Sequence, residues 1–194
     1  MKTYALRALA LAATVSLAAC IQRPQSPREQ RENIDRASLK ALGVILNQVP
    51  DGAGRTLRAR FGDAAELVAV DYQPRSPKPG DTVNVAFYYR VVDETDDDWK
   101  IFVHVDNRGG SVDRINGDHW PAKDKYRTSN WKKGEVVRDD WSFKIPGFYQ
   151  GDGLDVWTGF YMPGKDDRWP LTNKSEVQND GQNRVLATTI MVAK

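Results

Sequence analysis

The stretch that decides the fold is Thr82-Val-Asn-Val-Ala-Phe-Tyr-Tyr-Arg-Val-Val92, followed after the acidic segment 93–98 by Trp99-Lys-Ile-Phe-Val-His-Val-Asp106. Both runs are rich in β-branched and aromatic residues, a composition that is typical of strands. The charged residues between them are typical of an exposed loop. We therefore expect two long neighbouring strands, joined by an acidic hairpin loop, at the centre of an all-β domain.

Shorter segments of the same composition surround this pair, separated by Gly- and Pro-containing turns about every 8–12 residues. The segments expected to be strands are 55–61, 65–72, 112–115, 135–145, 154–162, 168–171 and 184–192. This spacing predicts a mainly β fold over residues 55–194. We expect an antiparallel β-sandwich of the immunoglobulin-like or jelly-roll-like kind.

Ahead of the strands, residues 31–50 carry apolar side chains at a spacing of about 3.6, which predicts one helix. Pro50-Asp51-Gly52 ends this pattern. The polar face includes Glu32 and Asp35 as well as basic residues, so we expect the helix to pack on the sandwich. The alternative is an amphipathic helix that lies on a membrane surface.

Residues 1–19 have the composition of a secretory signal peptide. Lys2 and Arg7 give a positive start, and residues 8–19 are apolar apart from one threonine and one serine. A transmembrane helix needs about 20 apolar residues, so this run is too short to be one. Its length fits the apolar region of a signal peptide, which has about 7–15 residues.

The end of this leader, Leu17-Ala18-Ala19-Cys20, resembles the lipobox of bacterial lipoproteins. In that family the cysteine thiol is joined to a diacylglycerol, the leader is cut before the cysteine, and the new amine is often acylated. Acyl chains contribute about 0.8 kcal/mol per buried methylene, enough for two or three chains to hold a protein on a bilayer. The resemblance therefore implies a palmitate-type anchor on Cys20, the only cysteine. The alternative is a soluble secreted protein with an incidental cysteine.

Residues 20–30 carry Gln, Arg, Pro and Ser without an apolar period, which predicts a flexible tether. Ile21 follows the cysteine, whereas in lipoproteins of the enteric type an Asp there retains the protein in the inner membrane. The expected location is therefore the bacterial cell envelope, on the outer membrane facing the periplasm.

The charge balance argues against nucleic acid as a partner. The chain has 28 basic and 26 acidic residues, and two of the basic ones, Lys2 and Arg7, belong to the leader. Without the leader the chain has 26 basic residues (28 − 2 = 26) and 26 acidic ones, so its net charge is zero. It therefore has no excess of positive charge that would attract nucleic acid. One cysteine and two histidines cannot supply the about four ligands of a structural zinc site. We expect no cofactor and no metal.

Several segments of the domain together resemble a known type of domain. They are Phe61-Gly62-Asp63, residues 66–72, Lys78-Pro79-Gly80-Asp81-Thr82, residues 99–106, Trp131-Lys132-Lys133-Gly134-Glu135, Gly159-Phe160-Tyr161, Arg168 and residues 181–185. They are similar to an extracytoplasmic β-sandwich domain found in bacterial lipoproteins and beside membrane-embedded glycosyltransferase-like proteins. The similarity covers roughly residue 57 to the end and consists mostly of turn glycines and aromatic residues. It implies the fold and the location, and it implies no activity.

The candidate ligand-binding residues are Asp118, His119, Trp120, Tyr126 and Trp131, all in the long loop 117–133. An Asp beside a His can orient the imidazole as a general base, and flat aromatic rings can stack on sugars. The alternative is that these side chains only brace the loop through hydrogen bonds. We assign no catalytic residue.

Two further features have structural and functional interpretations. His104 lies on the strand face opposite Ile101, Val103 and Val105, so we expect a hydrogen-bonded sheet residue rather than a ligand. The acidic segment 93–98 has the oxygen ligands that calcium prefers, but its order fits no known calcium loop. Charge at a loop tip also keeps sheets from pairing edge to edge.

Taken together, these features predict a lipid-anchored, non-enzymatic binding or scaffolding module of the bacterial envelope. The membrane is its first partner, through Cys20, and an envelope protein or glycan is the second. The alternative function is binding or cleavage of envelope glycans by the loop that carries Asp118 and His119.

Overall fold

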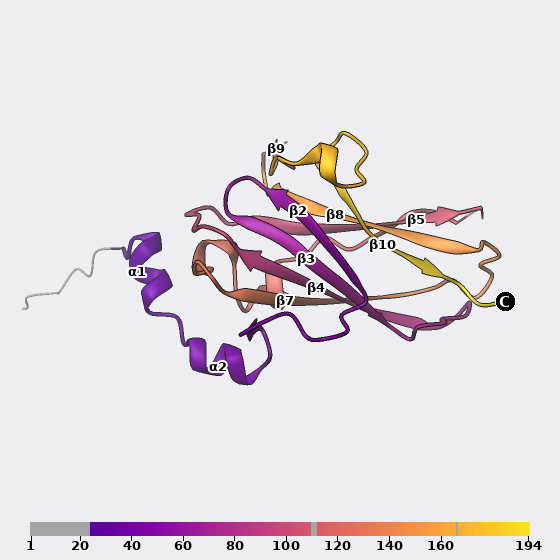
Figure 1. The fold of residues 1–194 in the computed structure, drawn as a ribbon, viewed down its shortest axis with the longest axis horizontal. Helices are drawn as coiled ribbons and strands as arrows, with labels where there is room; N and C mark the ends of the chain where they lie inside the picture. The colour runs from indigo at the N-terminus through magenta and orange to yellow at the C-terminus, as the bar shows by residue number, and fades with distance from the viewer. Residues whose placement is uncertain (1–23, 110–111, 166) are drawn as a thin grey trace, which may run out of the picture.

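The computed structural model describes residues 24–109, 112–165 and 167–194. The expected signal peptide, Cys20 and the first residues of the tether lie outside these ranges. The described chain forms two antiparallel sheets packed face to face (Figure 1), which confirms the predicted β-sandwich. No helix in these ranges is long and apolar enough to span a membrane.

Sheet A has the strand order β1-β7-β4-β3-β2, with all neighbours antiparallel. Its strands are β1 (Ile45–Leu46), β2 (Arg55–Phe61), β3 (Ala65–Gln73), β4 (Thr82–Val91) and β7 (Val136–Lys144). The sandwich therefore begins before residue 55, because β1 pairs with β7.

Sheet B has the order β10-β8-β5-β6, and β9 pairs with the end of β8. Its strands are β5 (Lys100–Arg108), β6 (Ile115–Asn116), β8 (Gly153–Met162), β9 (Asp167–Arg168) and β10 (Val185–Met191). The connecting loops in the described ranges contain the short 3-10 helices η1 (Pro121–Asp124), η2 (Thr128–Asn130) and η3 (Lys174–Glu176).

The core between the sheets is centred on the ring of Phe160. This ring lies 5.1 Å from that of Phe61, 5.2 Å from those of Tyr89 and Trp169, and 6.2 Å from that of Trp131, measured between centroids. All four contacts are edge-to-face, the geometry that aromatic quadrupoles favour. These rings come from both sheets and from the long loop, so the loop belongs to the core.

The expected hairpin of residues 82–106 is wrong. β4 pairs with β3 and β7 in sheet A, whereas β5 pairs with β8 and β6 in sheet B. The acidic segment 93–98 therefore crosses from one sheet to the other, as connections in sandwiches commonly do. The alternation of apolar residues shows which face of a strand is buried, but it does not show which strand lies beside it.

The expected single helix over 31–50 is also wrong. The segment contains two short helices, α1 (Pro27–Glu32) and α2 (Arg36–Ala41), and then β1. Asn33 caps the end of α1, Asp35 caps the start of α2, and Gly43 follows with a φ of 69°. The apolar spacing continues through these breaks, so periodicity alone does not reveal them. The expected tether, residues 20–30, overlaps α1, which begins at Pro27.

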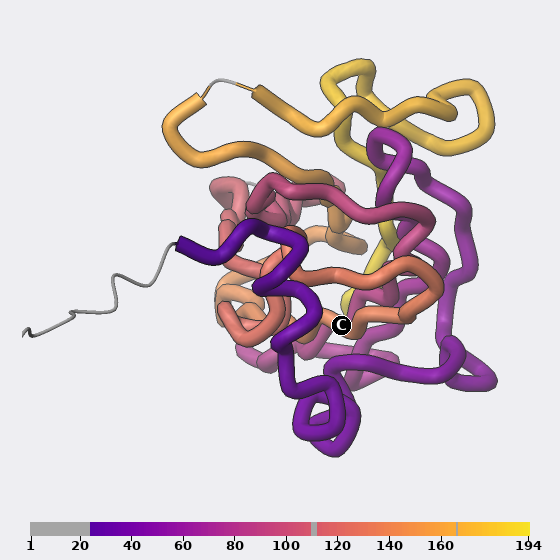
Figure 2. Tube along the Cα trace, turned by 90° about the vertical axis from the view of Figure 1, so that its left-hand side faces the viewer, coloured from indigo at the N-terminus to yellow at the C-terminus, as the bar shows by residue number. Residues whose placement is uncertain are grey.

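The N-terminal segment packs on the domain through the buried guanidinium of Arg31. It donates to the carbonyls of Ser129 (3.0 Å) and Thr95 (2.9 Å), and to the carboxylates of Glu94 (2.9 Å) and Asp96 (3.0 Å). Figure 2 shows this segment running across the loops at one end of the sandwich. The acidic segment is thus partly neutralised by an arginine. Within the described ranges, no three His, Cys, Asp or Glu side chains are grouped to hold a metal ion.

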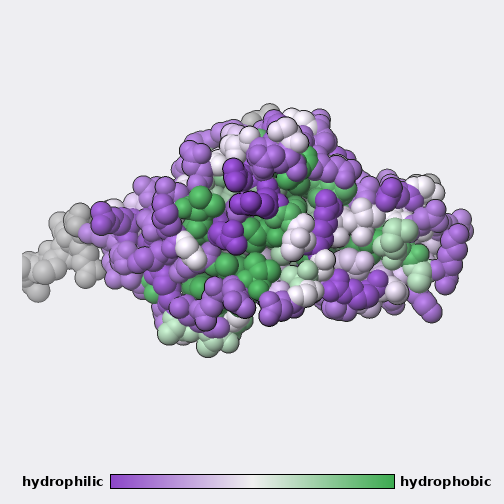
Figure 3. Space-filling view, viewed as in Figure 1, coloured by the Kyte–Doolittle hydropathy of each residue, from purple (hydrophilic) through white to green (hydrophobic). Residues whose placement is uncertain are grey.

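A second, smaller apolar cluster lies on the outer face of sheet A. It contains Val68, Ala69, Ala86, Tyr88 and Val136, with Leu46, Val49 and Ala53 packed against them. Residues 46–53 therefore cover part of this face. Figure 3 shows apolar side chains gathered in the middle of this view, with hydrophilic ones among them and at both ends.

Candidate functional site

The candidate residues Asp118 and His119 lie on a segment that extends sheet B along β5. Backbone hydrogen bonds of 3.0 and 2.9 Å join Ile101 and His119, which form an antiparallel bridge. Because successive residues of an extended segment point to opposite faces, His119 points into the sandwich and Asp118 points out of it. The structure therefore separates two side chains that the sequence suggested as a pair.

His119 is held at both ring nitrogens. Its Nε2 lies 2.7 Å from Oδ2 of Asp139, and its Nδ1 lies 2.8 Å from the carbonyl of Gly117. Asp139 lies in β7 and is completely buried, and its Oδ1 accepts a bond of 2.7 Å from the amide of Ala122. The pair therefore joins sheet A to the edge of sheet B, and the imidazole has no free nitrogen for a substrate.

The environment of His119 favours its charged form. Burial lowers the pKa of the imidazole, but the hydrogen bond and charge of Asp139 and the bond to Gly117 together raise it above its ordinary value. In the charged form both ring nitrogens donate, which matches the two acceptors that face them. This is the arrangement of a structural ion pair rather than of a general base.

Of the three aromatic candidates, two belong to the core. Tyr126 and Trp131 are fully buried; the Tyr126 hydroxyl donates to Glu135, and Trp131 Nε1 donates to the carbonyl of Tyr126 at 3.0 Å. Trp120 is half-buried, and the Arg127 guanidinium lies 4.3 Å from its ring centroid. The Lys100 ammonium also lies over the Trp120 ring, 5.2 Å from its centroid.

Asp118 instead lines a cleft on the outer face of sheet B, which we call the sheet B cleft. Its volume is about 190 Å³, and its lining residues are Phe102, His104, Asp118, Tyr161, Lys165, Asp167 and Arg168. β5 and β8 are hydrogen-bonded neighbours, with Phe102 opposite Gly159 and His104 opposite Trp157. Alternate residues of these two strands therefore share the outer face, where Trp157 lies next to the cleft.

The ring of Phe102 forms the floor of this cleft. A Cβ on Gly159 would lie 2.6 Å from this ring, so only glycine leaves room for it beside the backbone of β8. The Arg168 guanidinium lies 4.7 Å from the Phe102 centroid, and the Tyr161 ring centroid lies 6.5 Å from it. Phe102 is therefore buried, and the half-buried Tyr161 and Arg168 present the accessible surface.

The polar side chains of the cleft include both acidic and basic groups. Burial and the nearby Arg114 and Arg184 lower the pKa of His104, which Asp118 opposes only in part. Its Nδ1 lies 3.4 Å from Nη1 of Arg184 and so acts as the acceptor of a neutral imidazole. Burial, together with the charge of Asp118 and a hydrogen bond to it, raises the pKa of Tyr161. The cleft can thus both donate and accept hydrogen bonds around its aromatic groups.

Sequence reasoning did not find Phe102, Tyr161 or Arg168, and it placed His104 only as a sheet residue. The alternation of residues 101–105 does put Phe102 and His104 on one outer face. What the sequence does not show is that β8 lies beside β5, and this neighbour relation brings Tyr161 to the same place.

Comparisons with known proteins do not assign this chain to a family. No family model matches the chain, and no curated protein matches it. Four chains among the solved structures match, and one of them is the crystal structure of the C-terminal domain of wzt. It has a TM-score of 0.49 and 13% sequence identity, and the match covers 77% of this chain and 89% of that one. A likeness at this level carries no inference about a ligand or a partner.

Proposed function

We propose that this chain is a non-enzymatic binding module of the bacterial cell envelope. In this proposal a lipid on Cys20 holds it at the outer membrane facing the periplasm, and the sheet B cleft binds part of an envelope glycan. The lipobox-like end of the leader supports the anchor. The cleft supports the binding activity.

The observation that carries the proposal is the composition of the cleft. Tyr161 offers ring surface, and Asp118, His104 and Arg168 offer hydrogen-bond acceptors and donors around it. Sugars need both, because their C–H faces stack on rings and their hydroxyl groups donate and accept. At about 190 Å³ the cleft is smaller than the roughly 300–1,000 Å³ of sites that enclose a drug-sized ligand. It therefore suits contact with a few groups of a longer chain.

The geometry of His119 argues for binding over cleavage. A general base needs a nitrogen or oxygen within hydrogen-bond reach of its substrate. Both nitrogens of His119 are already bonded inside the protein, and Asp118 points away from it. Glycan cleavage by an Asp118–His119 pair is therefore disfavoured.

The experiment measures binding of oligosaccharides released from peptidoglycan and from lipopolysaccharide by isothermal titration calorimetry. We expect Tyr161→Ala and Arg168→Ala to weaken binding by roughly threefold to tenfold each, because the first removes a ring contact and the second a hydrogen-bond donor. Tyr72→Ala and Arg75→Ala are the matched controls. Arg75 lies over the Tyr72 ring at 5.4 Å, away from the cleft, so these changes should leave binding unaltered.

Two results would count against the proposal. One is that neither glycan binds, and the other is that the Tyr72 and Tyr161 variants bind equally well. Hydrolysis of either oligosaccharide by the purified protein would overturn the non-enzymatic part. The anchor is tested separately: Cys20→Ser should abolish labelling by a fatty-acid probe and release the protein from the membrane fraction.

A further inference from the structure

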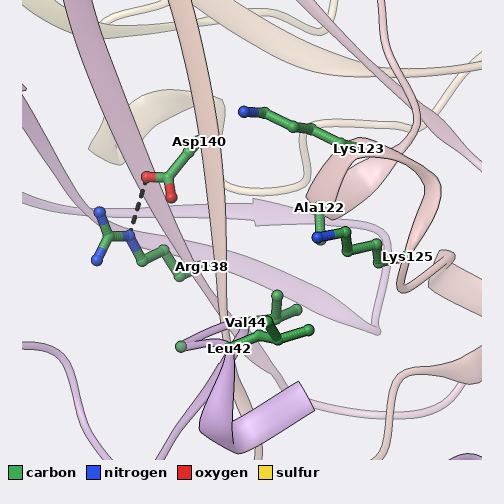
Figure 4. A pocket seen from close by; sticks show the side chains of 8 residues that line it. Leu42, Val44, Ala122, Lys123, Lys125, Arg138 and Asp140 are labelled. Carbon is green, nitrogen blue, oxygen red and sulfur yellow. Dashed lines mark hydrogen bonds and ion pairs between the residues drawn. The ribbon is translucent and has the colours of Figure 1, made fainter. Parts of the chain in front are cut away.

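A second cavity lies near the edge of sheet A, and we call it the lysine pocket. Its volume is about 130 Å³, and it is lined by Leu42, Gly43, Val44, Ala122, Lys123, Lys125, Arg138 and Asp140. Figure 4 shows these side chains around one space, with Leu42 and Val44 on one side and the two lysines on another. It is separate from the sheet B cleft, with which it shares no lining residue.

The pocket carries an excess of positive charge. Of its three basic side chains only Arg138 is paired, through Nε to Oδ1 of Asp140 at 2.9 Å (Figure 4). The neighbouring Asp124 is bonded to Arg127 and not to a lysine. In the described part of the chain, neither Lys123 nor Lys125 has an ion-pair partner. Two cations are therefore left for an anion from outside.

The loop that carries the lysines is held in an unusual conformation. Ala122, Lys123 and Asp124 have φ values of 52°, 55° and 66°, a region that residues other than glycine rarely occupy and then singly. The buried carboxylate of Asp139 holds this turn in place by accepting from the Ala122 amide at 2.7 Å. Backbone strain of this kind collects at functional sites. Here this turn carries Lys123, which lines the pocket together with Lys125 and Arg138.

Size and charge restrict what the pocket can hold. A volume of about 130 Å³ is well under half of the roughly 300 Å³ at which sites for drug-sized ligands begin. One small anionic group fits. Lysine and arginine side chains are the usual partners of phosphate. The rim includes Leu42, whose side chain is 61% exposed although it is large and apolar.

The place of the pocket along the chain indicates where the phosphate comes from. Six residues, 21–26, separate Cys20 from α1, and they span at most about 22 Å when fully extended. Leu42 directly follows α2, which lies next along the chain from α1 (Figure 1). A lipid on Cys20 would therefore keep this end of the domain near the bilayer. The surface of a membrane with anionic lipids attracts lysines and arginines.

From these observations we infer that the lysine pocket receives the phosphate of an anionic lipid headgroup. Lys123, Lys125 and Arg138 bind the phosphate, and Leu42 enters the interface beside it. The domain then docks directly against the membrane to which it is tethered. The location argument rests on the proposed anchor, whereas the contact itself involves only the folded domain.

The test uses the mature chain carrying Cys20→Ser, so that binding cannot come from the anchor. Sedimentation with phosphatidylethanolamine vesicles containing phosphatidylglycerol should show binding that vesicles without the anionic lipid do not. The double change Lys123→Ala and Lys125→Ala should weaken this binding by roughly tenfold or more, since each lysine contributes to attraction at the surface. Lys132→Ala with Lys133→Ala removes the same charge outside the pocket and is the matched control.

Further measurements distinguish a lipid headgroup from free phosphate as the ligand of the pocket. Leu42→Ser should weaken vesicle binding and leave binding of inorganic phosphate unchanged. If inorganic phosphate binds at the lysines while anionic vesicles do not, the headgroup assignment is wrong. An equal loss in the two double variants would show nonspecific attraction and would also overturn it. Thermal unfolding of each variant shows whether it is folded. Lipid labelling of Cys20 is scored independently, so failure of docking and failure of the anchor are told apart.

Discussion

The imidazole of His119 and the carboxylate of Asp139, 2.7 Å apart, connect the two sheets at the edge where β7 faces the segment beside β5. The same carboxylate fixes the amide of Ala122, which starts the left-handed turn carrying Lys123. One buried acid thus holds the long loop in place for both surfaces that we assign to binding. Asp118 faces the sheet B cleft on one side, and Lys123 faces the lysine pocket on the other.

Removal of the Asp139 carboxylate should lower the free energy of unfolding. Asp139→Ala leaves the His119 ring and the Ala122 amide without their acceptor inside the protein, and breaking a buried pair typically costs about 3–5 kcal/mol. We expect the free energy of unfolding, measured by urea denaturation, to fall by that amount. Asp140→Ala, one residue along and exposed, removes only a surface ion pair and should cost less than about 1 kcal/mol. Equal losses in the two variants would show that Asp139 is not the support that we describe.

The pKa values of the two histidines should be shifted in opposite directions from the ordinary value. The chain has only His104 and His119, so their imidazole signals in an NMR titration separate easily. We expect the pKa of His104 to lie below the ordinary value of about 6.5, because of burial and the nearby arginines. We expect the pKa of His119 to lie above that value, because the bonds and charge of Asp139 outweigh burial.

These shifts also set the pH dependence of stability. For His119, whose pKa is raised, the stabilising contribution is complete below about pH 6.5 and is lost as the pH rises through the folded-state pKa. For His104, whose pKa is lowered, the contribution is present above about pH 6.5 and is lost as the pH falls through the folded-state pKa. His119→Gln should therefore flatten the decline of unfolding free energy above about pH 6.5. A decline of unchanged slope in this variant would contradict the assignment.

The N-terminal segment should depend on Arg31. Arg31→Ala leaves the carbonyls of Ser129 and Thr95 without their donor, and lost hydrogen bonds of this kind cost about 1–3 kcal/mol. We expect faster amide hydrogen exchange throughout residues 27–41, with the sandwich strands unaffected. Arg28→Ala, in the same helix but exposed, is the control and should behave like the natural chain. If both variants exchange alike, Arg31 does not hold the segment.

Gly159 should be needed for the floor of the cleft. In Gly159→Ala the new methyl would lie 2.6 Å from the Phe102 ring and 2.7 Å from the carbonyl oxygen of Asn183, so one of them must move. Overpacking of this kind costs about 1–3 kcal/mol. We expect a lower midpoint of thermal unfolding together with weaker glycan binding. A variant with full stability and full binding would show that Phe102 does not need this space.

Much of the sandwich could be predicted from the sequence because alternation and turn residues are local signals. The strand expected at 55–61 matches β2 at both ends, and the others of five residues or more differ by two residues at most. The two expected strands of four residues, 112–115 and 168–171, overlap the two-residue strands β6 and β9 by one residue each. Pairing is not local, so the sequence suggests that 82–92 and 99–106 lie side by side although they belong to different sheets. The prediction of one helix over 31–50 is wrong because Asn33 and Asp35 cap two separate helices. The apolar spacing continues through this break and so does not reveal it.

The structure does not bring together the residues that the sequence suggests for a site. The sequence directed attention to Asp118, which lines the sheet B cleft, and to Trp131, which belongs to the core. Composition cannot separate an aromatic side chain on a loop from one that the loop buries. The sequence also does not show that Asp139 is the partner of His119. Asp139 is 20 residues away, and nothing in the sequence distinguishes it from the adjacent Asp140 of the same strand.

The central claim is that a glycan binds at the sheet B cleft while His119 remains a structural residue. The most direct measurement follows the imidazole NMR signals of both histidines during addition of the peptidoglycan and lipopolysaccharide oligosaccharides. We predict that the signals of His104, which lines the cleft, shift in proportion to the bound fraction, and that those of His119 stay where they are. Glycan binding that moves His119 and leaves His104 unchanged would contradict the account.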